Sequence, residues 1–228
     1  MMPSKLCPVI VLCSVAALCA GSESQSEPQP SRWEKTIAGF EEWDSKNTFA
    51  SDAVLFVGSS SIRLWATRNC FPEFSAINRG FGGSHISDAN YFFHRIVLPY
   101  EPRVIVLYAG DNDIAAGKSP QRVFNDYKRF VALVRDSLPA TRIVFVGIKP
   151  SESRWSFWPA MKEANRKIKE FSQTDGRLFF FDSGTPLLGA DGKPHARFFR
   201  DDKLHLNDEG YKVWTRLLRP VIEKAMRK

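Results

Sequence analysis

Three adjacent serines are the first residues in this sequence that could carry out chemistry. Ser59, Ser60 and Ser61 follow the apolar run 53–57 and Gly58. An apolar run without alternation indicates a strand buried on both faces, so the serines are expected at its carboxyl end. Ligands of open α/β sheets bind at that edge, where a serine is placed for nucleophilic attack. Taken alone, three serines after a strand are more typical of a helix cap and turn.

Asp202 and His205 could supply the base that a serine nucleophile requires. Their spacing of three residues allows one local turn to bring the carboxylate to Nδ1 while Nε2 faces the serine. Asp201 beside them raises the question of a metal site, but no second His or Cys cluster in the sequence supports one. The remaining histidines lack such a setting and are expected to be structural or exposed: His85, His94 and His195.

Two further segments carry groups suited to stabilise a developing oxyanion. A strand candidate in 74–81 leads into Gly82 and Gly83, which allow the backbone to approach a ligand, although such pairs are more often ordinary turns. The run 103–109 has the clearest pattern of a buried strand, and Asn112 follows it in the sequence GDND. The carboxyl ends of several predicted strands therefore bring polar groups to one edge of a sheet.

The elements that must position these residues alternate as strands and helices. The pattern predicts an α/β fold, a three-layer α/β/α sandwich around a five-stranded parallel sheet. Analogy with doubly wound folds gives the strand order 2-1-3-4-5. The expected strands lie in 53–57, 74–81, 103–109, 141–148 and 177–181. The expected helices cover 32–43, a short stretch from about 61, 85–97, 119–138, a stretch through 164–171, and a terminal segment capped by Asn207 or Asp208.

Together these segments resemble the four sequence blocks of the SGNH, or GDSL, hydrolases. GSSSI, the Gly-Gly of NRGFGGS, GDND and DKLHL occur in the usual order, over nearly all of 32–228. The resemblance implies a serine esterase with the SGNH fold that works through an acyl-serine and needs no cofactor or metal. It implies Ser60 as nucleophile, His205 as base and Asp202 as its partner. The implied oxyanion donors are the backbone N–H groups of Ser60 and Gly83 and the side-chain amide of Asn112.

The first block departs from the family pattern. The usual Gly-Asp-Ser is replaced by Gly58-Ser59-Ser60, so Ser59 and Ser61 stay open as alternative nucleophiles. The G-x-S-x-G elbow of the α/β-hydrolases is absent, because Ile62 stands where its second glycine would be. That family is the poorer match.

The loop after the fourth predicted strand is the candidate substrate-binding segment. It carries Trp155 and Trp158, with Lys149 and Arg154 nearby. No insertion is long enough to form an apolar lid, so short acyl esters, above all acetyl groups on a carbohydrate, are expected. A lysophospholipase or thioesterase acting on longer chains is the alternative, and both tryptophans could instead pack on the core. A non-catalytic carbohydrate-binding protein on the same fold is the rival from another class.

The amino terminus predicts export. Lys5 precedes a short apolar segment ending near Ala20, so 1–20 reads as a secretory signal peptide, with lipidation at Cys19 the weaker alternative. Residues 21–31 read as a disordered linker, and 32–228 as one hydrolase domain. The net charge of +7 is scattered rather than massed in a basic stripe, so nucleic acid is not an expected partner. The expected partner is a small-molecule or polysaccharide ester substrate.

Overall fold

Every predicted apolar run forms a strand of one parallel sheet in the computed structural model, which describes residues 30–227. The strands are β1 (Val54–Gly58), β2 (Ala76–Gly80), β3 (Val104–Tyr108), β4 (Arg142–Val146) and β5 (Leu178–Phe181). Their order, β2-β1-β3-β4-β5, confirms the predicted topology. The predicted signal peptide and nearly all of the predicted linker lie outside the described residues, and they stay predictions.

The sheet separates two apolar cores, which explains why β1 shows no alternation in sequence. Leu55 and Val57 pack into the core on one face, and Val54 and Phe56 pack into the core on the other. All four side chains are fully buried. Because both faces are covered, every position of the strand favours an apolar residue.

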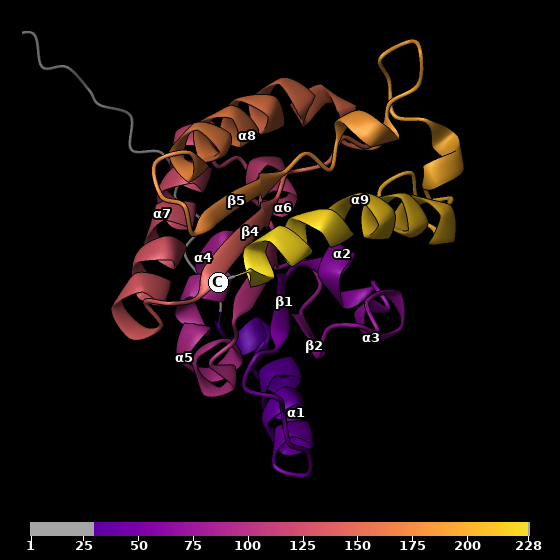
Figure 1. The fold of residues 1–228 in the computed structure, drawn as a ribbon. Helices are drawn as coiled ribbons and strands as arrows, with labels where there is room; N and C mark the ends of the chain where they lie inside the picture. The colour runs from indigo at the N-terminus through magenta and orange to yellow at the C-terminus, as the bar shows by residue number, and fades with distance from the viewer. Residues whose placement is uncertain (1–29, 228) are drawn as a thin grey trace, which may run out of the picture.

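Two layers of helices provide that cover, as Figure 1 shows. One layer contains α1 (Glu34–Asp44), α4 (Ile86–Tyr91), α5 (Phe93–Ile96), α7 (Pro120–Ser137) and α8 (Trp158–Ser172). The opposite layer contains α2 (Ser60–Arg63), α3 (Thr67–Cys70) and α9 (Asp208–Met226). Asn207 caps α9 as predicted, since its side-chain oxygen accepts from Gly210 N at 3.1 Å. No helix within 30–227 combines the length and apolar character needed to cross a bilayer.

The single helix predicted over 85–97 is wrong, because α4 and α5 are separate. Phe92 stands between them with φ −86° and ψ 6°. This ψ departs from the helical value of about −42°, which interrupts the helix at that residue. The rings of Phe92 and Phe93 on either side of the break are both buried, at 1% and 0% exposed. The chain then closes in the short 3₁₀ helix η2 (Leu98–Tyr100).

Two other segments are more ordered than the sequence suggested. The GDND segment after β3 begins a short helix, α6 (Asp111–Ala115). Trp158, which was expected in a loop, is the first residue of α8, and Trp155 begins a 3₁₀ helix. The 3₁₀ helices besides η2 are η1 (Pro30–Arg32), η3 (Trp155–Phe157), η4 (Thr185–Leu187) and η5 (Ala196–Phe198).

Candidate active site

The turn from β1 into α2 exposes one of the three serines. Gly58 has φ +138°, and a Cβ there would lie 1.8 Å from the carbonyl oxygen of Tyr108, so only glycine fits. Ser59 and Ser61 are 0% and 1% exposed, whereas Ser60 is only partly buried. Ser60 is therefore the serine that a ligand at this edge can reach.

Ser60, His205 and Asp202 form a continuous hydrogen-bonded chain. Ser60 Oγ lies 2.9 Å from His205 Nε2, and His205 Nδ1 lies 2.6 Å from Asp202 Oδ2. The other carboxylate oxygen, Asp202 Oδ1, accepts the N–H groups of Leu204 and His205, each at 2.9 Å. The sequence spacing of three residues thus closes one local turn, as expected from the pattern.

The charge of the Asp202 carboxylate is strongly favoured. Burial acts to raise its pKa, but the hydrogen bonds from the His205 ring and from the backbone N–H groups of His205 and Leu204 together outweigh it. The pKa of Asp202 therefore falls well below its ordinary value. An ionised carboxylate in contact with Nδ1 holds the ring with its proton on that nitrogen and leaves Nε2 free to accept one.

Lys149 supports this turn from below, which corrects its assignment as a substrate-binding residue. Its side chain is 1% exposed, and Nζ donates to the carbonyl oxygen of Leu204 at 2.8 Å. Burial lowers the pKa of Lys149 to about 8, although the nearby carboxylates of Asp111 and Asp202 favour its charge. The residue lies in the segment that continues β4 under the Asp202–His205 turn, so it contacts the protein and not solvent.

Gly83 and Asn112 follow the two strands that flank β1, and the segments that carry them are in contact. Asn112 Nδ2 donates to the carbonyl oxygen of Ser84 at 3.1 Å, which joins the end of β3 to the glycine turn after β2. Gly83 has φ +80°, a conformation that favours glycine. Within residues 30–227 its N–H donates to no acceptor. That free donor suits an oxyanion site.

Arg154 holds Asn112 in place. Its Nη2 donates to Asn112 Oδ1 at 2.9 Å, and its Nη1 lies 3.2 Å from Asp111 Oδ2. The guanidinium thus contacts Asn112 and Asp111, and the assignment of Arg154 to substrate binding stays a prediction.

Trp155 and Trp158 stack at 6.3 Å between ring centroids, and Trp158 also packs on the core. Both tryptophans are partly buried, and their contact with a sugar ring stays a prediction.

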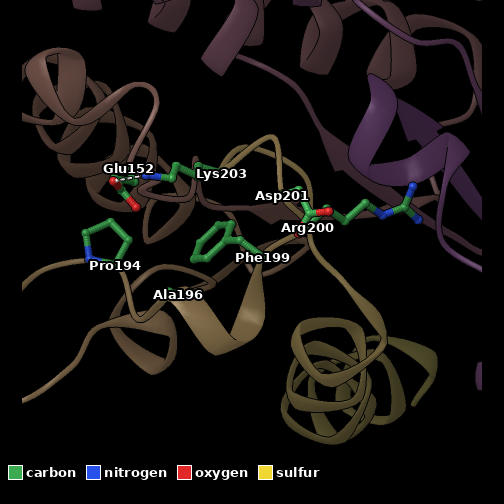
Figure 2. A pocket seen from close by; sticks show the side chains of 7 residues that line it. All are labelled: Glu152, Pro194, Ala196, Phe199, Arg200, Asp201 and Lys203. Atoms are coloured by element: carbon green, nitrogen blue, oxygen red, sulfur yellow. Dashed lines mark hydrogen bonds and ion pairs between the residues drawn. The ribbon is translucent and has the colours of Figure 1, made fainter.

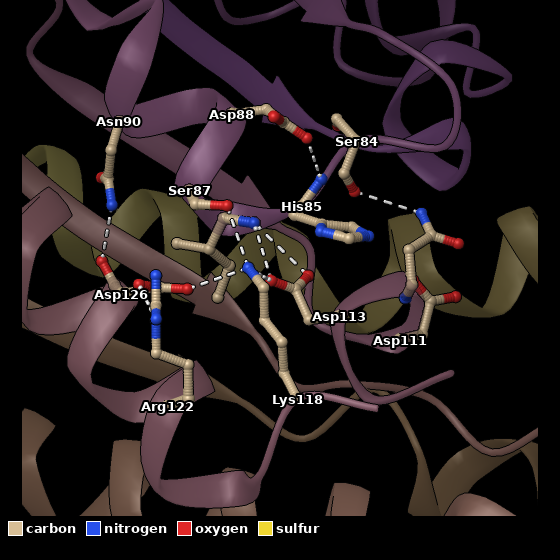
Figure 3. A network of polar contacts seen from close by, with 12 residues as sticks. Ser84, His85, Ser87, Asp88, Asn90, Asp111, Asp113, Lys118, Arg122 and Asp126 are labelled. Carbon is tan, nitrogen blue, oxygen red and sulfur yellow. Dashed lines mark hydrogen bonds and ion pairs between the residues drawn. The ribbon is translucent and has the colours of Figure 1, made fainter. Parts of the chain in front are cut away.

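A buried charge cluster behind Asn112 was not visible in the sequence (Figure 3). Lys118 Nζ contacts Asp113 Oδ1 at 2.9 Å, Asp126 Oδ2 at 3.0 Å and Ser87 Oγ at 2.9 Å. Asp113 also accepts the N–H of Ile86 at the start of α4. Burial raises the pKa of Asp113 to about 6, against the opposing effect of Lys118. The cluster ties α4, α6 and α7 together beside the glycine turn.

A pocket of about 270 Å³ lies against the outer side of the catalytic turn. Figure 2 shows the Phe199 ring in it, with the Lys203–Glu152 ion pair at one side and Asp201 at the other. Lys203 and Asp201 flank Asp202 in sequence. Two lining residues of the pocket therefore come from the turn that carries Asp202, and Ser60 and His205 are not among its lining residues.

The other histidines take no part in this arrangement. His85 is partly buried, and its N–H donates to Asp88 at 2.8 Å, while His94 and His195 are exposed. Within the described part of the chain, no three His, Cys, Asp or Glu side chains are grouped to hold a metal ion.

Comparison with known proteins gives consistent matches. Residues 60–213 match the GDSL-like lipase/acylhydrolase family. Platelet-activating factor acetylhydrolase IB subunit alpha1 of Bos taurus is 26% identical over 185 residues, which is 76% of each chain. A GDSL-like lipase of Bacteroides thetaiotaomicron superposes with a TM-score of 0.69 at 20% identity, covering 86% of this chain and 98% of its own. A carbohydrate esterase family 3 protein of Talaromyces cellulolyticus superposes with a TM-score of 0.62 at 15% identity, covering 77% of this chain and 98% of its own. These structural matches support the same fold.

Proposed function

This chain belongs to the GDSL-like lipase/acylhydrolase family and is a carboxylic ester hydrolase, and we propose that Ser60 is its nucleophile. The observation that carries the assignment is the contact of 2.9 Å between Ser60 Oγ and His205 Nε2. Asp202 completes the chain from the far side of the ring. A nucleophile, a base and an orienting carboxylate in this geometry are what acyl transfer requires.

The reaction follows from these contacts. Ser60 Oγ attacks the ester carbonyl carbon while His205 Nε2 takes the hydroxyl proton. The C–O bond to the alcohol then breaks, and His205 returns the proton to the departing oxygen. Water attacks the acyl-serine by the same steps, which releases the acid and restores the Ser60 hydroxyl. Asp202 stays ionised and stabilises the imidazolium formed in each half.

The developing oxyanion would lie between three donors. The Ser60 N–H belongs to the first turn of α2, where backbone donors have no partner within the helix. The Gly83 N–H has no acceptor within the described residues, and Asn112 Nδ2 uses one hydrogen for Ser84 and keeps a second. These donors would stabilise negative charge that exists only in the transition state and intermediate, which is how such a site accelerates acyl transfer.

We propose short acyl esters, principally acetyl groups on a carbohydrate, as the substrates. The name of the bovine relative, an acetylhydrolase, supports the acyl part, and that of the fungal structure, a carbohydrate esterase, supports the alcohol part. Trp155, which follows Arg154 in sequence, is partly exposed, and an aromatic face suits a sugar ring. The intact set of Ser60, His205 and Asp202 argues against a purely carbohydrate-binding protein.

A panel of esters tests the acyl part. Acetyl, butyryl, octanoyl and palmitoyl esters of one alcohol are compared, with Ser60→Ala as the inactive control. An acetyl-sized site should give kcat/KM values that fall steeply with chain length. A maximum at octanoyl or beyond would overturn the acetyl proposal and favour the lysophospholipase or thioesterase alternative.

Export is proposed from the sequence alone. The segment before Ala20 has the charge, length and apolar character of a signal peptide. Fractionation of cells expressing the full chain, with sequencing of the mature amino terminus, tests this. An uncleaved chain found in the cytoplasm would contradict it, and a lipid-modified Cys19 would replace secretion with anchoring.

A further inference from the structure

Two guanidinium groups lie against the glycine turn that follows β2. A Cβ placed on Gly82 would be 2.8 Å from Arg63 Nε, and one on Gly83 would be 3.0 Å from Arg32 Nη2. The arginines come from segments far apart in sequence, α2 and η1, and meet on either side of the same two residues. Gly83 is also the proposed oxyanion donor, so both cations border the reaction site.

Neither arginine is neutralised by the protein. Within residues 30–227, the Arg63 guanidinium makes no ion pair or hydrogen bond, and the Arg32 guanidinium makes no polar contact and stacks on the Trp33 ring at 4.0 Å. Both side chains are exposed. By contrast, Arg95 and Arg166 are each paired with two glutamates. The positive charge at this turn is therefore available to a ligand.

The position of Arg63 relates this charge to the ester bond. It follows Ser60 by three residues, which places the two side chains on the same side of α2, about one turn apart. Arg32 lies against the next residue of the turn, Gly83, and its charge contributes to lowering the pKa of His85, where burial is the largest cause. An anion bridging the two guanidinium groups would lie beside a carbonyl group held over Ser60.

We propose that Arg32 and Arg63 bind a carboxylate on the alcohol part of the substrate, so that the enzyme prefers esters of acidic sugars over neutral ones. The inference rests on the ester hydrolase function proposed above and specifies its substrate class. Planar guanidinium groups match the geometry of a carboxylate and are weakly hydrated, which suits this role. Stacking on Trp33 holds the Arg32 side chain over the turn at little cost in side-chain freedom.

A matched pair of acetyl esters tests the proposal. The anionic substrate is 4-acetoxybenzoate, and the neutral one is its methyl ester. We expect kcat/KM to be about tenfold higher for the anion at low salt, and the ratio to fall as sodium chloride is added. Arg63→Gln and Arg32→Gln should each lower that ratio severalfold, and the double variant should bring it to about one. Arg63→Lys, which keeps the charge, should retain part of the preference.

The control is Arg68→Gln, which removes one exposed positive charge on α3, away from the glycine turn. It should leave the ratio unchanged, which separates local binding from the general effect of a basic surface. Hydrolysis of both esters at equal kcat/KM, or an equal loss of preference in Arg68→Gln, would overturn this inference alone. Failure to hydrolyse the neutral ester at all would contradict the proposed function, and this inference with it.

Discussion

The two sides of Ser60 are held in place by different kinds of contact. On the base side, Asp202 and His205 belong to one short exposed turn, closed by hydrogen bonds between residues two or three apart. On the oxyanion side, Asn112 is fixed by long-range contacts to Ser84 and Arg154 and by the buried Lys118 cluster behind it. Local contacts thus orient the group that moves a proton, with Lys149 supporting its turn through the carbonyl oxygen of Leu204, while side-chain contacts between distant segments fix Asn112.

The largest effect in this comparison is expected from Asp202→Asn on the base side. An amide at this position keeps the size of the side chain but favours the wrong tautomer of His205, so kcat should fall by about a thousandfold or more. Because the turn is exposed, the melting temperature should change little. Steady-state kinetics measure kcat, and thermal unfolding measures the melting temperature. Near-normal kcat would show that Asp202 does not orient the ring.

Removing the oxyanion donor should have the next largest effect. Asn112→Ala should lower kcat by about a hundredfold and leave KM nearly unchanged, because the donor acts on charge present only in the transition state. Asn125→Ala is a suitable control, since Asn125 lies on the exposed face of α7 and contacts only Gln121. A large rise in KM at constant kcat would instead mark Asn112 as a ground-state contact.

Stability should distinguish the two sides as well. Lys118→Met leaves the fully buried Asp113 without its cation, so the free energy of unfolding should fall by about 3 kcal/mol. Lys203→Met breaks the exposed Lys203–Glu152 ion pair of the base side and should cost about 0.5 kcal/mol or less. Urea unfolding of both variants measures the difference. An equal decrease in the free energy of unfolding for the two variants would mean that the buried cluster does not stabilise the oxyanion side.

The pH profile gives a smaller effect that concerns the base side alone. His205 must be neutral to accept the proton of Ser60, so protonation of its ring stops the reaction. The pKa of Asp202 is lowered, so its carboxylate stays ionised while the ring is protonated and adds no second proton. Protonation of that single base should therefore make log kcat/KM fall with a slope of one as the pH decreases. A slope of two would show that another group titrates with the base.

The same difference between the two sides explains what the sequence could predict. The turn of Asp202 and His205 was predictable because its spacing encodes a local contact, and the buried strands were predictable from unbroken apolar runs. The Lys118 cluster was not, because a lone charged residue near a helix is usually exposed, and its burial depends on three helices meeting. Lys149 was likewise predicted to bind substrate, because the sequence does not show that its side chain is buried under the Asp202–His205 turn.

Helix boundaries show a similar limit. The rhythm of 85–97 fits one helix, and the backbone of Phe92 interrupts it at a point where the apolar pattern continues. The oxyanion residues Gly83 and Asn112 were found through family motifs, whereas Arg154, which holds Asn112, was assigned to substrate. Its partner lies 42 residues away in sequence, a separation that no local pattern reports.

The most direct test of the account is the site of covalent labelling by a fluorophosphonate probe. The folded full chain is treated with the probe, digested, and mapped by mass spectrometry, with Ser60→Ala as the control. We predict a single adduct on Ser60 and none in the variant, because Ser60 alone of the three serines contacts His205. An adduct on Ser59 or Ser61, or labelling that persists in Ser60→Ala, would contradict the assignment of the nucleophile.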